Sequence, residues 1–142
     1  MIYVNKLQRV SFFFLLLPFL LSGAAGPRIY QKKPLPHTVT QILVVSHHGD
    51  HDMTRQYTQP HKIQPVLQYL RLLKREGTAD LDPELLTGDR YDITLYYSDG
   101  QQKIYWQRSN RYLSKNCQQW EKINQEQAER LYPILQAMPS DI

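Results

Sequence analysis

The chain contains a single cysteine, Cys117, in its 142 residues. One cysteine cannot form an internal disulfide, so the fold must depend on its hydrophobic core. Cys117 lies in a polar stretch, residues 114–119, and no His–Asn or His–Asp arrangement marks it as a nucleophile. We therefore expect either an inert thiol or one that pairs with another chain.

The sequence also lacks the motifs of common catalytic sites. It has neither a glycine-rich phosphate loop nor a Gly-x-Ser-x-Gly nucleophile turn. Asp80, Asp82 and Glu84 alternate, but they lack the glycine and the distal glutamate of an EF-hand loop. No catalytic residue is predicted, and we expect a domain that is not an enzyme.

A concentrated basic face is missing as well. The chain has 17 basic and 13 acidic residues, and two of the basic ones, Lys6 and Arg9, belong to the N-terminal signal described below. The others form scattered groups such as Lys32-Lys33. Nucleic-acid binding requires basic residues gathered on one surface, so we expect no nucleic-acid partner.

The only long apolar run is Val10–Leu21, which follows Lys6 and Arg9 and precedes the small residues 22–26. This order of basic, apolar and small residues is typical of a secretory signal peptide. The run is shorter than the roughly 20 residues of a membrane-spanning helix. We predict a signal peptide over residues 1–25 and a secreted or extracytoplasmic protein, which contacts the membrane only through this segment if it stays uncleaved.

The end of this segment resembles a bacterial lipobox without its acceptor. Leu21-Ser22-Gly23 matches the first three residues of Leu-Ser-Gly-Cys, but Ala24 occupies the position of the cysteine. Alanine has no thiol to carry a lipid. Lipid anchoring is therefore not expected, and the small residues 22–25 offer more than one cleavage site.

After a proline-rich linker, residues 26–38, we predict a single domain over residues 39–142. Residues 41–46 and 53–58 favour two strands joined by a turn, and 120–123 a further short strand. Two amphipathic helices are indicated by apolar residues at helical spacing. Their stripes are Ile63, Val66, Leu67, Leu70 and Leu73 in the first helix, and Ala128, Leu131, Tyr132, Leu135 and Met138 in the second.

The clearest element is a β-hairpin over residues 91–108. Its strands alternate in polarity around Asp99-Gly100, a pair favoured in two-residue turns. In that register Leu95 faces Ile104 and Ile93 faces Trp106 on the buried side. The fold class predicted is therefore α+β, with a small antiparallel sheet of three to five strands packed by two helices.

A histidine-rich turn is one candidate site. His47, His48 and His51 lie within residues 47–52 together with two aspartates. Imidazole is a ligand for zinc, copper and nickel, so the cluster could hold a divalent metal ion. The alternative is a solvated turn, because neighbouring imidazoles in one tight turn rarely converge on one ion. No other cofactor is predicted.

Aromatic residues of the hairpin form a second candidate site. In the predicted register Tyr96, Lys103 and Tyr105 lie together on the outer face of the sheet. Amphipathic rings on a rigid sheet can bind a protein, a peptide or a cell-wall component. The alternative is that the linker, residues 108–116 or a helix covers this face. We predict a binding domain, with metal binding through residues 47–52 as the alternative function.

Several segments resemble a family of small uncharacterised exported domains, often lipoprotein-like, from Gram-positive bacteria. The resemblance covers roughly residues 57–141 and implies an exported domain with the order strand, helix, hairpin, helix, but no activity, ligand or site residue. It is carried by Tyr57-Thr58, the helix 63–73, Tyr91–Leu95, Ser98-Asp99-Gly100, Asn110–Leu113, Leu131-Tyr132, Leu135 and Met138–Asp141. The cysteine missing at Ala24, Pro65 and the histidine-rich turn depart from the pattern.

Overall fold

The computed structural model describes residues 37–79 and 82–142, which lie within one compact unit of the chain. The predicted signal peptide, Ala24 and most of the predicted linker fall outside these residues. Among the described residues, no helix has the length and apolar character needed to cross a membrane.

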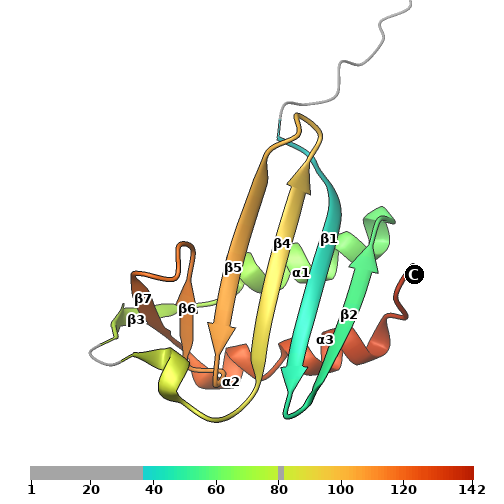
Figure 1. Cartoon of the computed structure of the whole chain (residues 1–142). Coiled ribbons are helices and arrows are strands. Elements are labelled where there is room, and N and C mark those ends of the chain that lie inside the picture. Colours follow the sequence, from blue (N-terminus) through green and yellow to red (C-terminus); the bar gives the residue numbers. More distant parts are fainter. Residues whose placement is uncertain (1–36, 80–81) are drawn as a thin grey trace, which may run out of the picture. The chain divides into compact units, whose positions relative to one another are not determined.

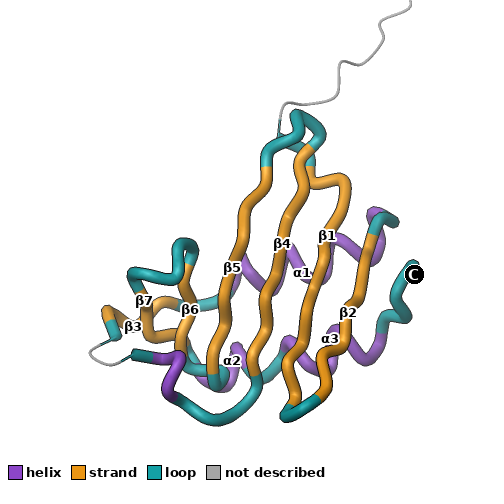
Figure 2. The backbone as a smooth tube through the Cα atoms, in the orientation of Figure 1, coloured by secondary structure: helices purple, strands orange, loops and turns teal. Residues whose placement is uncertain are grey.

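The described residues form an antiparallel sheet of seven strands (Figures 1 and 2). Its order is β2-β1-β4-β5-β6-β7-β3. The strands are β1 (Val39–His48), β2 (His51–Tyr57), β3 (Arg75–Thr78), β4 (Arg90–Tyr97), β5 (Gln102–Arg108), β6 (Tyr112–Ser114) and β7 (Trp120–Ile123).

The prediction of three to five strands was therefore wrong. The sequence signal missed β3 and β6, which are four and three residues long. Such strands are too short to show alternating polarity, and Gly77 within β3 looks like the end of the preceding helix. Both are strands only because neighbouring strands pair with them.

Three helices lie on one face of the sheet: α1 (Pro60–Leu72), α2 (Gln125–Ala128) and α3 (Leu131–Ala137) (Figure 1). Helix α1 buries Ile63, Val66, Tyr69 and Leu70 against the sheet. Alternate residues of the central strands, among them Ile42, Val44, Ile93 and Leu95, complete the core. We call this side the helix-covered face and the other side the open face.

The predicted last helix is divided into α2 and α3. Asn124 caps α2 by accepting a hydrogen bond from the Gln127 amide at 3.1 Å. Pro133 has no N–H and would clash with the carbonyl four residues earlier, that of Glu129. The helix is interrupted at Glu129 and Arg130, where this proline would disturb it.

The hairpin β4–β5 forms, but in a register one residue away from the predicted one. Leu95 lies opposite Lys103 and Ile93 opposite Tyr105. The loop has three residues, because the Tyr97 amide bonds to the Gln101 carbonyl at 2.9 Å and Gly100 adopts a φ of 83°. Asp-Gly also fits this longer loop, a turn followed by a left-handed glycine.

The one-residue shift moves every side chain of β5 to the other face of the sheet. Ile104 and Trp106, predicted to be buried beneath the helices, lie on the open face. Tyr105 and Lys103, predicted to be on the outer face, lie on the helix-covered face.

Candidate functional site

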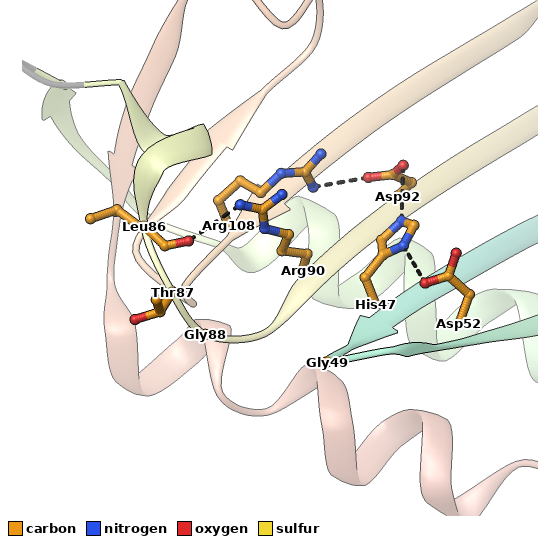
Figure 3. A pocket seen from close by; sticks show the side chains of 9 residues that line it. All are labelled: His47, Gly49, Asp52, Leu86, Thr87, Gly88, Arg90, Asp92 and Arg108. Carbon is orange, nitrogen blue, oxygen red and sulfur yellow. Dashed lines mark hydrogen bonds and ion pairs between the residues drawn. The ribbon is translucent and has the colours of Figure 1, made fainter.

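The larger of two notable cavities opens on the open face where β1, β4 and β5 meet the segment after the short 3₁₀ helix η1 (Pro83–Leu85) (Figure 3). Its volume is about 590 Å³. It is lined by His47, Gly49, Asp52, Leu86, Thr87, Gly88, Arg90, Asp92 and Arg108.

His47 lies between two carboxylates in this cavity. Its Nδ1 is 2.7 Å from Oδ1 of Asp52, and its Nε2 is 3.3 Å from Oδ2 of Asp92. The β1–β2 register brings His47 directly opposite Asp52. A neutral imidazole donates from one nitrogen only, so both contacts are hydrogen bonds only when His47 carries a proton on each nitrogen.

Arg108 continues the network from Asp92. Its guanidinium donates to Asp92 Oδ1 at 2.9 Å and to Glu84 Oε1 at 3.0 Å, while its side chain is 8% exposed. The Arg108 guanidinium also lies 5.8 Å from the centre of the Trp120 ring. This arginine therefore joins η1, β4 and β7 at one point.

Glu84 offsets the repulsion between two neighbouring arginines. Arg90 and Arg108 are directly opposite in the β4–β5 register, an arrangement that is unfavourable for like charges. Glu84 contacts both, reaching Arg90 Nη1 at 3.4 Å, and its own carbonyl accepts from Arg90 Nη2 at 2.6 Å. The carboxylate thereby fixes the segment around η1 over the sheet.

The cavity's charged side chains thus neutralise one another. Neither a thiol nor a serine is among the described residues that line the cavity. We interpret the network as a set of contacts that holds the segment around η1 against this end of the open face.

The three histidines predicted as a metal site do not converge. The turn between β1 and β2 is only Gly49-Asp50, so the histidines lie in the strands and alternate between faces. His47 is on the open face, whereas His48 and His51 are directly opposite each other on the helix-covered face. Among the described residues, no three His, Cys, Asp or Glu side chains form a group that could hold a metal ion.

The predicted aromatic set is also separated. Tyr105 is 9% exposed in the core, with the Lys103 ammonium 5.1 Å from the centre of its ring. Tyr96 is half-buried on the open face, opposite Gln102. The hairpin therefore does not present Tyr96, Lys103 and Tyr105 as one platform.

A different set of residues gathers on the open face. Across the sheet, Leu43, Thr94 and Ile104 form one row, and Val45, Asp92 and Trp106 form the next. The apolar members are half-buried and lie outside the core under the helices. We call Leu43, Val45, Tyr96, Ile104 and Trp106 the open-face patch.

None of the protein-family models, curated proteins or solved structures compared with the chain matches it. The resemblance to small exported domains of Gram-positive bacteria therefore stays a prediction. The site has to be interpreted from its own geometry.

Sequence reasoning missed both the charge network and the open-face patch. Glu84, Asp92 and Arg108 come from separate segments of the chain, so no local motif links them. In the observed register Arg90 faces Arg108, and such a like-charged pair favours a carboxylate nearby, but the predicted register does not place the two arginines opposite each other. Only the correct register would have revealed it.

Proposed function

We propose that this protein is an exported bacterial domain, not an enzyme, that binds a protein or peptide through the open-face patch. The observation that supports this is the chemistry of an uncovered sheet face. A sheet with one solvated face normally alternates apolar inward and polar outward residues. Here Leu43, Val45 and Ile104 break that rule on the side that carries no α-helix among the described residues.

The composition of the patch favours a protein or peptide ligand over a carbohydrate. Aliphatic side chains provide apolar contact area, whereas Trp106 and Tyr96 add rings of the type enriched at protein interfaces. The neighbouring charge network would form a polar rim at one end. Exposed apolar patches with polar rims are typical of interaction sites.

The binding proposal is tested by photo-crosslinking in cells that express the full chain. A photoreactive amino acid replaces Ile104 in one variant and, as the matched control, Leu72 in another. Leu72 is 61% exposed on α1, in the layer on the other side of the sheet. We expect a discrete adduct from position 104 only, and its loss when Val45→Thr is added.

Equal adducts from both positions, or none from position 104, would contradict the proposal. An adduct between position 104 and cell-wall glycan would support the binding surface but contradict a protein or peptide as its ligand. Folding of each variant is checked by far-UV circular dichroism before the comparison.

Export is tested separately on the same cells. N-terminal sequencing of the extracytoplasmic fraction should place the mature start among residues 23–27. A chain that keeps Met1 and stays in the cytosol would refute this part of the proposal and leave the binding surface untouched.

A further inference from the structure

We propose that His48, His51 and Met53 form a binding site for copper(I) at the tip of the β1–β2 hairpin. The three side chains share the helix-covered face, because His48 pairs with His51 and Met53 pairs with Ser46 on that face. The site is independent of the open-face patch, which lies on the other side of the sheet.

Strand geometry brings the three donors together. Residues directly opposite in an antiparallel pair have Cβ atoms about 5 Å apart, and diagonal neighbours about 7 Å. His48 and His51 are such an opposite pair, and Met53 is two residues along β2 from His51. The imidazole and thioether side chains are long enough to meet over this area.

The surroundings orient His48 as a ligand. Its Nδ1 lies 3.2 Å from Oδ1 of Asp89, and its ring makes edge contacts with Tyr91 and Tyr132. A carboxylate beside one ring nitrogen of a histidine favours the proton on that nitrogen and leaves the lone pair of the other nitrogen for a metal ion. His47 differs, because both of its nitrogens already contact carboxylates.

The remaining donors are accessible. His51 is exposed, and Met53 is 48% exposed, so both side chains are open to an ion from solvent.

The donor set selects the ion. A thioether is a soft ligand that favours copper(I), whereas imidazole accepts several metals. Two imidazoles and one thioether give a three-coordinate site without any negative ligand, which suits a soft monovalent cation. Carboxylate-preferring ions such as calcium and magnesium are disfavoured for the same reason.

The test is methyl NMR of the full chain labelled with [methyl-¹³C]methionine and titrated with copper(I), kept reduced by ascorbate under argon. Copper(I) is diamagnetic, so its binding shifts a methyl signal without broadening it. We expect a saturable shift of the Met53 methyl at one equivalent. The Met138 methyl, which packs against the core, should not move and serves as an internal control.

Four variants make the result specific. His51→Ala and Met53→Leu change exposed residues, so the fold should survive, and each should weaken copper(I) binding by about a hundredfold. Binding is followed by the Met53 methyl in His51→Ala and by the histidine ring signals in Met53→Leu. Asp89→Asn removes only the partner of the ligand and should weaken binding by roughly tenfold. His61→Ala, an exposed histidine on α1, should leave the affinity unchanged.

No shift of the Met53 methyl with excess copper(I) would overturn the proposal. An unchanged affinity for copper(I) in His51→Ala would also overturn it, because His51 would then not be a ligand. An affinity for zinc, measured from the histidine signals, that exceeds the affinity for copper(I) would overturn it as well, because the imidazole pair would then be a zinc site.

Discussion

Arg108 shows how one side chain stabilises the open face. It is nearly buried, yet it carries a charge that Asp92 and Glu84 neutralise, and it also donates to the Tyr91 carbonyl at 3.3 Å. Removing one partner of a buried ion pair leaves the others uncompensated. The arginine is therefore worth more to the fold than a surface charge would be.

We predict that Arg108→Met lowers the free energy of unfolding by about 3 kcal/mol, the lower end of the range for a buried pair because Asp92 and Glu84 are partly exposed. Arg111→Met, an exposed change three residues away, should stay within about 0.5 kcal/mol of the parent chain. Urea unfolding followed by fluorescence measures both. Equal effects of the two changes would show that the network is only a surface feature.

At the scale of the element, the hairpin β4–β5 marks the limit of what the sequence can predict. Alternation over residues 91–98 and the Asp99-Gly100 pair indicate where the two strands lie. The same dipeptide fits a loop of two or of three residues. That single residue decides whether Tyr105 or Trp106 meets the helices, so the location of the hairpin was predictable and its faces were not.

Gly100 sets this register through its backbone. Its φ of 83° lies in the left-handed region, and a Cβ added there would meet no atom within 4 Å. The cost of a side chain is then backbone strain alone. We predict that Gly100→Ala lowers the free energy of unfolding by about 1 to 2 kcal/mol, and Gly100→Asn by less, because asparagine tolerates this conformation.

Urea unfolding compares the two variants. If alanine and asparagine cost the same, the left-handed conformation is not what glycine supplies. An unchanged stability for Gly100→Ala would contradict the left-handed conformation of Gly100, which both the three-residue loop and the predicted two-residue turn require.

Other elements were unpredictable for a different reason. β3 and β6 become strands through pairing with β7, a tertiary effect that short sequences do not record. The charge network likewise joins η1, β1, β2, β4 and β5, so the spacing of residues within any one segment does not predict it. Most of the two amphipathic stripes could be derived, although Tyr132 is 49% exposed and the buried Tyr69 was not included. The positions of the histidines could also be derived, but not which of them share a face.

At the scale of the whole molecule, the segment after α3 returns to the start of α1. The Asp141 carboxylate accepts from the Thr58 amide at 2.7 Å and pairs with Lys62, while its own amide bonds to the Gln56 carbonyl at 2.8 Å. Hydrogen bonding to Lys62 and to the Thr58 amide holds the pKa of Asp141 well below its usual value of 3.8. These contacts cover part of the outer edge of β2.

This low pKa predicts an acid-dependent loss of stability. The ionised form is favoured by folding, so its contribution is complete above pH 3.8 and is lost as the pH falls further toward the folded-state pKa. Asp141→Asn should be less stable at pH 7 and should lose less stability on acidification. Urea midpoints at pH 7 and pH 3 measure this, with Asp50→Asn in the exposed turn as the control.

Parallel pH profiles for the parent chain and Asp141→Asn would contradict this assignment. The same two midpoints for Lys62→Met should reproduce the effect from the other partner, because the ion pair needs both groups.

The position of β3 has a consequence for the time course of folding. The hairpins β1–β2 and β4–β5 connect residues close in sequence and can form within microseconds. β3 follows α1 early in the chain, but among the described strands it pairs with β7 alone, and β7 comes after three later strands. Pairing of β3 with β7 closes the long loop between them, which costs conformational entropy. We therefore expect β3 to be the last strand to dock during folding and the first to detach during unfolding.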